Sequence, residues 1–179
     1  MASTTQLLVM SDSHGDKAVI QSLKDYYRGK VKAIFHNGDS EIDSTDPIWQ
    51  GVAVVRGNCD TDGGYPNRLL TVIDDVRIAQ THGHLYGINF GWQNLDYWAA
   101  EMQADICLYG HLHVPDAVIR NKTLFINPGS VTQPRGLINE KLYALITIEP
   151  DAYRVDFYNL DHKQYPGLSN RFLKEELKT

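Results

Sequence analysis

Several features that mark other classes of protein are scarce in this chain. Of its 179 residues only two are cysteine, Cys59 and Cys107, too few for a disulfide framework, although one bridge between them stays open. The apolar run at residues 7–10 is too short for a signal-peptide core or a membrane helix, and no basic cluster precedes it. These absences predict a cytoplasmic protein that does not cross a membrane.

Positive charge is also scarce. Seventeen lysines and arginines against 22 acidic residues give a formal net charge of -5, which argues against broad attraction to duplex nucleic acid or anionic lipid. The three tryptophans have no interleaved basic residues, a pattern more typical of a core or an interface than of platforms for stacked bases. We therefore expect no strong nucleic-acid binding, and any anion must be held locally.

The chain has no internal repeat, low-complexity run or flexible linker. Its hydrophobic content of 42% and charged content of 22% are close to the average for globular proteins. The length is enough for one hydrophobic core and short for two. We therefore expect one domain that spans residues 1–179.

The first third of the chain predicts buried parallel strands. Three continuous apolar runs, at residues 6–10, 31–35 and 52–55, each end in a polar turn. Between the first two, residues 17–27 place apolar side chains at helical spacing, and Asp16 is suited to cap that helix. This order of strand, polar loop and helix is typical of α/β proteins.

The rest of the chain predicts hairpins around one further helix and strand. Two strands flank Asp74-Asp75, two flank Asn121-Lys122 in a type I′ turn, and two flank Pro150-Asp151. The sequence also predicts a helix with its apolar face at residues 95–102, a strand at 106–109 and a terminal helix at 170–177. Parallel units followed by hairpins predict an α/β domain with mixed sheets.

Seven polar side chains lie at or just past the ends of the predicted strands. Because the carboxyl ends of strands in α/β sheets converge on one crevice, five separate segments could deliver these side chains to one place. Histidine and carboxylate together suit Mn, Fe, Zn, Ni or Co better than Ca or Mg. The candidate metal ligands are Asp12, His14, Asp39, Asn58, His82, His111 and His113.

Seven ligands exceed the three or four that one catalytic ion takes from a protein, which favours two ions with a bridging carboxylate. Asp39 is the central short acid and the candidate bridge. Two divalent ions, two aspartates and one metal-bound hydroxide leave a charge of about +1, which matches a singly charged phosphodiester. Such paired ions lower the pKa of water and generate the nucleophile, so the chemistry needs no serine or cysteine nucleophile.

The motifs that carry these ligands occur in a recognisable order. In these motifs the chain resembles the calcineurin-like metallophosphoesterase superfamily. Residues 126–135 extend the resemblance to the small bacterial and archaeal phosphodiesterase subgroup of that superfamily. The matching pieces are Asp12-Ser-His14, Gly38-Asp39, Gly57-Asn58-Cys59-Asp60, His82-Gly-His84, Gly110-His111-Leu-His113, Ile126-Asn127-Pro128-Gly129-Ser130 and Pro134-Arg135.

This resemblance implies a four-layer α/β/β/α sandwich and two divalent transition-metal ions, with manganese the first choice. It also implies a small phosphodiester substrate, hydrolysed by a hydroxide that bridges the two ions. One ion would be held by Asp12, His14, Asp39 and His113, and the other by Asp39, Asn58, His82 and His111.

Three residues are candidates for a direct catalytic role: Asn58, Cys59 and His84. In the superfamily a histidine follows the Gly-Asn pair and assists catalysis, whereas Cys59 stands at that place here. A thiol keeps its proton at neutral pH and is a weak donor, so His84 or a metal-bound water would supply a proton if the leaving group needs one. Whether Cys59 packs beneath the metals or faces the substrate stays open.

Two alternatives remain beside the phosphodiesterase. A phosphomonoesterase or phosphoprotein phosphatase would need more cationic contacts, for which Arg56 and Arg135 are the motif-linked candidates. A non-catalytic protein-binding scaffold is known for the same fold in the eukaryotic retromer coat, but that relative has lost several ligand side chains. Exposed apolar surface on the hairpins would support a homo-oligomer. For His36 and His162, which lie outside the motifs, we expect structural roles.

Overall fold

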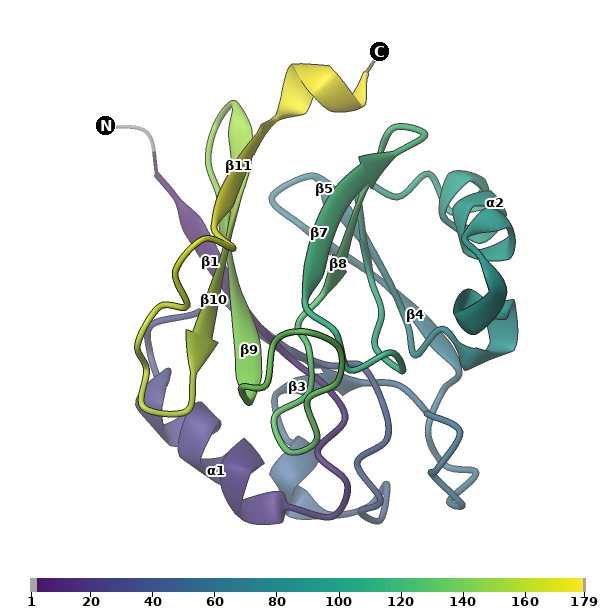
Figure 1. Cartoon of the computed structure of the whole chain (residues 1–179), viewed down its shortest axis with the longest axis vertical. Helices are drawn as coiled ribbons and strands as arrows, with labels where there is room; N and C mark the ends of the chain where they lie inside the picture. Colours follow the sequence, from purple (N-terminus) through teal and green to yellow (C-terminus); the bar gives the residue numbers. More distant parts are fainter. Residues whose placement is uncertain (1–2, 179) are drawn as a thin grey trace.

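The computed structural model describes residues 3–178 and contains two mixed β-sheets packed face to face (Figure 1). The six-stranded sheet has the order β11-β10-β9-β1-β2-β3 and the five-stranded sheet the order β4-β5-β6-β8-β7. The strands are β1 (Thr5–Met10), β2 (Ala33–His36), β3 (Val52–Val54), β4 (Arg68–Ile73), β5 (Val76–Thr81), β6 (Ile106–Leu108), β7 (Asp116–Arg120), β8 (Thr123–Asn127), β9 (Leu142–Ile148), β10 (Ala152–Asn159) and β11 (Asn170–Leu173).

The predicted parallel strands and hairpins are present. β1 pairs in parallel with β2, and β2 with β3, while β5, β6 and β8 form a parallel set in the other sheet. The β4–β5 and β7–β8 hairpins turn at Asp74-Asp75 and Asn121-Lys122, whose positive φ angles are those of a type I′ turn. β9 and β10 pair around Pro150-Asp151. The residue types at the turns therefore predicted these hairpins correctly.

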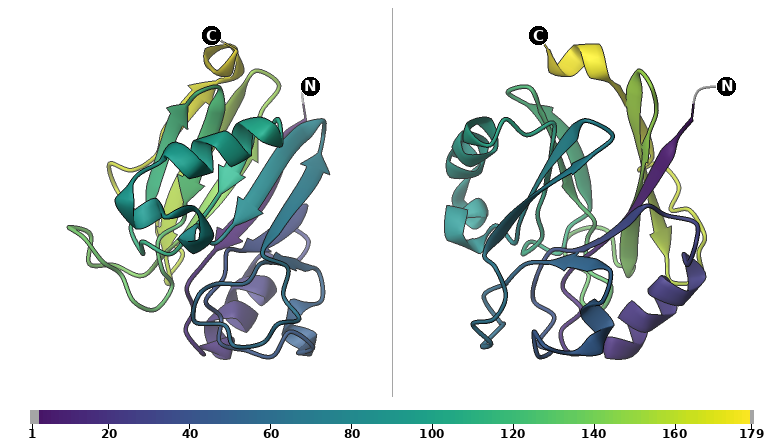
Figure 2. Two further views of the ribbon diagram at one scale, coloured as in Figure 1. Left: turned by 90° about the vertical axis from the view of Figure 1, so that its right-hand side faces the viewer. Right: turned by 180° about the vertical axis from the view of Figure 1, so that it is seen from behind.

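One helix covers the outer face of each sheet (Figure 2). Helix α1 (Lys17–Tyr26) begins after Asp16, whose side chain accepts a hydrogen bond from the backbone N–H of Val19, as expected for a cap. Helix α2 (Gln93–Glu101) packs Leu95 and Trp98 on the five-stranded sheet. Four 3-10 helices complete the described elements: η1 (Pro47–Trp49), η2 (His84–Tyr86), η3 (Ile88–Phe90) and η4 (Lys174–Leu177).

Alternation along the strands separates three apolar layers. In β1, Leu7 and Val9 face the other sheet, while Leu8 and Met10 face α1. The predicted four-layer α/β/β/α sandwich is thus confirmed, with its central core between the sheets. Cys107 is fully buried in the layer beneath α2, and both cysteines are free, so the bridge left open by the sequence is not formed.

The terminal helix predicted at residues 170–177 is wrong. Residues Asn170–Leu173 form β11, which pairs antiparallel with β10 from Val155 to Ala152, and only Lys174–Leu177 turn into a short 3-10 helix. β10 offers an open edge of backbone donors and acceptors, and pairing with it outweighs the helical propensity of a short segment. Phe172 is buried in the core by this pairing.

No helix among residues 3–178 is long and apolar enough to cross a membrane.

Candidate metal centre

The predicted ligands lie where the strands of both sheets end. Asp12 and His14 follow β1, and Asp39 follows β2. His82 follows β5, with His111 and His113 in the loop after β6. Their ligand atoms form two groups, each with all atoms within 4.8 Å of one another: Asp12, His14, Asp39 and His113 in the first, and Asp39, His82 and His111 in the second.

Several of these residues have a left-handed backbone, which side chains other than glycine rarely adopt. The φ angles of Asp12, Asp39 and His111 are 56°, 58° and 70°. Such strain persists only where surrounding contacts impose it, and it is frequent at functional sites. Here the carbonyl of Asp12 accepts hydrogen bonds from the hydroxyls of Ser130 and Thr132, at 2.8 and 2.9 Å. These two hydrogen bonds hold the backbone of Asp12 in place.

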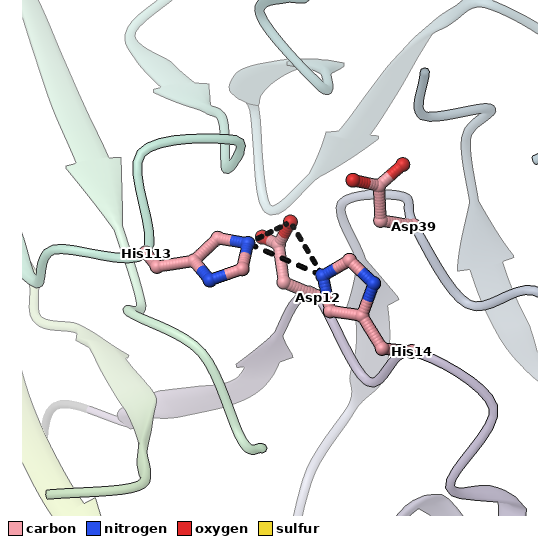
Figure 3. Close-up of side chains that lie close together, drawn as sticks. All are labelled: Asp12, His14, Asp39 and His113. Atoms are coloured by element: carbon pink, nitrogen blue, oxygen red, sulfur yellow. Dashed lines mark hydrogen bonds and ion pairs between the residues drawn. The ribbon is translucent and has the colours of Figure 1, made fainter. Parts of the chain in front are cut away.

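In the first group, the imidazoles of His14 and His113 and the carboxylate of Asp12 point toward one another (Figure 3). His113 Nδ1 lies 2.6 Å from the carbonyl oxygen of Gln133, and His14 Nδ1 lies 3.0 Å from a carboxylate oxygen of Glu41. Because neither oxygen can donate, both histidines carry their proton on Nδ1 and expose a free lone pair on Nε2. These two Nε2 atoms are 3.2 Å apart, and His113 Nε2 is 3.1 Å from Asp12 Oδ1.

Asp12 Oδ1 completes the first group and is itself an unpaired atom. It is buried and receives no hydrogen bond from a described residue. Burial alone would raise the pKa of Asp12, but the facing imidazoles of His113 and His82 hold it below its usual value, so the group is ionised. A buried carboxylate oxygen without a donor is costly, and a cation among these atoms would satisfy all of them at once.

In the second group, as in the first, a histidine binds a backbone carbonyl through Nδ1 and faces a carboxylate with Nε2. His82 Nδ1 lies 2.7 Å from the carbonyl oxygen of Asn37 and must donate to it, so the Nε2 atom faces Asp39 Oδ2 at 3.2 Å. Asn58 Oδ1 is 3.1 Å from the same nitrogen. Burial lowers the pKa of His82, yet the carboxylates of Asp39 and Asp12 outweigh it and raise the pKa overall. This position therefore favours a positive charge.

Asp39 belongs to both groups. One carboxylate oxygen faces His82, and the other accepts a hydrogen bond from the backbone N–H of Cys59 at 2.8 Å. Burial would raise the pKa of Asp39, but the His82 imidazole and the Cys59 N–H hold it well below its usual range. The shared position and the permanent charge are what a bridging ligand requires.

Comparison with known proteins places this geometry in a family. The sequence model for the calcineurin-like phosphoesterase superfamily domain matches residues 6–151. The chain belongs to this superfamily. The probable metallophosphoesterase YsnB of Bacillus subtilis strain 168 is 38% identical over 165 residues, which cover 92% of this chain and 97% of that protein. The predicted resemblance is confirmed, including the small bacterial and archaeal members.

Other relatives agree with the fold. A conserved uncharacterized protein from Streptococcus pneumoniae TIGR4, a predicted phosphoesterase, has a crystal structure with a TM-score of 0.94 and 53% identity, over 97% of this chain and 99% of that one. The phosphodiesterase YfcE of Escherichia coli K12 is 38% identical over 95 residues, 48% of this chain and 47% of that protein. Vps29 of Cryptosporidium parvum, at 19% identity with coverage of 95% and 98%, shares the fold with a TM-score of 0.76.

The donor set fits the metals that the superfamily's name implies. Imidazole nitrogens and carboxylate oxygens lie within 4.8 Å of one another in each group, and the buried Oδ1 of Asp12 lacks a donor among the described residues. Histidine and aspartate in these numbers are typical ligands of divalent transition ions. The seven predicted ligands are therefore brought together, with Asn58 reaching the second group through its amide oxygen.

Two further predicted residues, Cys59 and His84, border the second group. Cys59 is exposed, so it does not pack beneath the groups. Partial desolvation and the nearby charge of Asp39 raise the pKa of its thiol to about 11. The ring of His84 lies 5.3 Å from that of His82. Burial and the neighbouring imidazoles of His82 and His111 lower the pKa of His84 to about 4. At neutral pH the thiol keeps its proton and the imidazole is uncharged.

The two histidines outside the motifs lie outside both groups. His36 is buried, with Nε2 2.9 Å from the Ser13 hydroxyl and Nδ1 accepting from the backbone N–H of Gly38. His162 stacks on Tyr26 with ring centroids 3.5 Å apart. Arg135 is exposed and touches the site through its backbone, which donates to the carbonyl of His113.

Two acids that matter at the site were not predicted as site residues. Asp60 accepts hydrogen bonds from the backbone N–H groups of Asp39, Gly57 and Glu41, at 2.7 to 2.9 Å, and so ties two ligand loops together. The position of Asp60 in the Gly-Asn-Cys-Asp motif was the sequence signal that could have identified it as a site residue. Glu41 contacts His14, and nothing in the local sequence distinguishes it from a solvent-facing acid.

Replacing Gly57 with alanine is expected to weaken cation binding at both groups. A methyl group on Gly57 would overlap the carboxylate and the backbone nitrogen of Asp39, and that nitrogen cannot move freely. We expect cation affinity to fall about 10- to 100-fold and stability to fall by about 1–3 kcal/mol. Cation titration and urea unfolding measure the two effects.

The matched control for this change is Gly63→Ala in the same loop, where an added methyl group meets no atom within 4 Å. Equal cation affinity in the two variants would show that Asp39 is not held by this close packing.

Proposed function

We propose that this protein is a dinuclear metal-dependent phosphodiesterase. The observation that carries the proposal is the pair of ligand groups that share Asp39, with the buried Asp12 Oδ1 left without a hydrogen-bond donor. Two divalent cations held there would polarise phosphoryl oxygens and lower the pKa of a water molecule, the chemistry that phosphodiester hydrolysis requires. Asp12, His14, Asp39 and His113 would hold one cation, and Asp39, Asn58, His82 and His111 the other.

The residues around the groups favour a leaving group that needs little protonation. The Cys59 thiol keeps its proton but is a weak donor, and His84 is uncharged at neutral pH, so neither supplies a strong acid. His84 would act through the N–H of its neutral ring. Among residues 3–178, no arginine or lysine side chain is hydrogen-bonded to a residue of either group, which suits a diester anion better than a monoester dianion.

The test uses chelator-treated protein reloaded with one metal at a time: Mn, Fe, Zn, Ni or Co. We expect the manganese-loaded protein to hydrolyse bis-p-nitrophenyl phosphate faster than p-nitrophenyl phosphate. Cyclic nucleotides, glycerophosphodiesters and nucleic acid then define the natural class of diester. The name of the phosphodiesterase YfcE supports this choice of panel.

Each alternative predicts a different result. Faster hydrolysis of the monoester would indicate a phosphomonoesterase. Absence of bound metal by elemental analysis, together with no turnover under any of the five metals, would favour a protein-binding scaffold, the alternative raised by the shared fold of Vps29.

A further inference from the structure

Glu41 makes a side-chain contact that links two ligand loops. It lies two residues after Asp39, in the loop that follows β2, and its carboxylate reaches His14 in the loop that follows β1. The Glu41 side chain is 44% exposed, whereas that of His14 is 11% exposed. The backbone of Glu41 is left-handed, with φ of 55°, and its N–H is held by Asp60 at 2.8 Å. The carboxylate is thus placed by the fold.

The contact differs from those of the neighbouring histidines. His82 and His113 direct Nδ1 to backbone carbonyls, of Asn37 and Gln133, which any residue at those positions would supply. His14 directs Nδ1 to a carboxylate instead. A charged acceptor forms a stronger hydrogen bond and makes the opposite ring nitrogen a better ligand. The protonation pattern of His14 therefore depends on one side chain.

Without that carboxylate the proton of His14 would be better placed on Nε2. There it would face His113 Nε2 at 3.2 Å and Asp12 Oδ1 at 3.9 Å, both acceptors. Such a proton would occupy the position where a cation would bind, and it would have to be removed or shifted before the nitrogen could coordinate.

We propose that Glu41 is a positioning residue that keeps the His14 proton on Nδ1 and presents the Nε2 lone pair to the group formed by Asp12, Asp39 and His113. Its consequence for cation affinity rests on the metal site of the proposed function. The role is confined to the first group, because Glu41 touches no histidine of the second among the described contacts.

The decisive measurement is made on metal-free protein. Long-range proton–nitrogen NMR at a pH of about 8, above the reference pKa of free imidazole, reports which ring nitrogen of His14 carries the proton. We expect the Nδ1–H form in the natural sequence and a shift toward the Nε2–H form in Glu41→Ala. Glu41→Gln keeps an oxygen acceptor and is expected to fall between them.

The second measurement is titration with Mn. We expect two binding steps in the natural sequence, and in Glu41→Ala one step weakened about 10- to 100-fold while the other is unchanged. The matched control is Asp43→Asn, which removes an exposed negative charge two residues further along the same loop. It is expected to leave both the His14 proton and both affinities unchanged.

The outcomes separate this inference from the proposed function. An unshifted His14 proton in Glu41→Ala overturns the inference, as does an equal effect in Asp43→Asn, which would indicate general electrostatics. Loss of affinity in both binding steps also overturns it, because the role would not be confined to one group. If the natural protein binds no Mn but the proton shifts as expected, the positioning role stands and the proposed function fails.

Discussion

Replacing Asp39 with asparagine is expected to reduce phosphodiester hydrolysis by at least about 1,000-fold, the effect of losing several kcal/mol of transition-state stabilisation. Asparagine has the same shape, so the hydrogen bond from the Cys59 N–H can be kept. The change removes the one carboxylate that both groups share, and with it the charge that His82 faces at 3.2 Å. We expect metal content to fall with activity, as measured by elemental analysis after dialysis.

The chain offers a close control for this variant. Asp75 has φ of 64°, near the 58° of Asp39, but lies in the β4–β5 turn at the start of β5, away from the strand ends that carry the ligands. Asparagine tolerates this backbone, so Asp75→Asn makes the same chemical change without touching the site. Full turnover and normal metal content in Asp39→Asn would refute the assignment of both groups.

The second large effect is expected in stability at acid pH, through His36. Complete burial, opposed in part by the charges of Asp12 and Asp60, lowers the pKa of His36 to about 4 from the ordinary 6.5. Its Nδ1 accepts from the Gly38 N–H, so an added proton would meet another donor. The unfolded chain therefore binds this proton more readily than the folded protein.

The direction in which stability changes with pH follows from this difference in proton binding. The contribution of His36 is fully present above the unfolded pKa of 6.5 and is lost as the pH falls toward about 4. A shift of this size corresponds to about 3 kcal/mol of unfolding free energy between about pH 7.5 and about pH 4. Urea unfolding across this range, with chelator present to exclude metal release, measures it.

His36→Asn is the variant that isolates this group, because asparagine offers an oxygen acceptor toward Gly38 and does not titrate. It should be less stable at neutral pH, through lost packing against Trp49, but less sensitive to acid. Parallel pH curves for the two proteins would mean that the acid sensitivity arises elsewhere, for instance from the ionised carboxylates of Asp12 and Asp39.

Much of the fold was predictable because its signals are local. A continuous apolar run that ends in a polar turn identified β1, β2 and β3, and paired residues suited to positive φ identified the β4–β5 and β7–β8 turns. β11 was mistaken for a helix because its structure depends on β10, whose pairing residues lie 15 to 21 positions earlier in the chain. No periodicity within residues 170–177 reports that partner.

The ligand positions were predictable for a similar reason, since motifs at strand ends are brought together by any α/β sheet. The contacts that orient them were not. The Asp12 backbone is held by two hydroxyls from residues more than a hundred positions away in the sequence. His113 is oriented by a backbone carbonyl, which a residue of any type could supply, so the sequence does not identify it. In the sequence, Glu41 cannot be distinguished from a solvent-exposed acid, because its contact with His14 forms only when the loop after β1 packs beside it.

The sequence by itself determined the set of side chains able to hold metal and an α/β domain with mixed sheets, because these follow from spacing along the chain and from the chemistry of histidine and aspartate. The order of its motifs determined the family, and the resemblance to that family implied the four layers. Only the tertiary structure decided that Asp39 belongs to both groups, that Asp12 Oδ1 lacks a donor, and that the Nδ1 atoms of His82 and His113 face backbone carbonyls. These properties depend on distances between segments that are remote in sequence, and such distances exist only once the two sheets have packed.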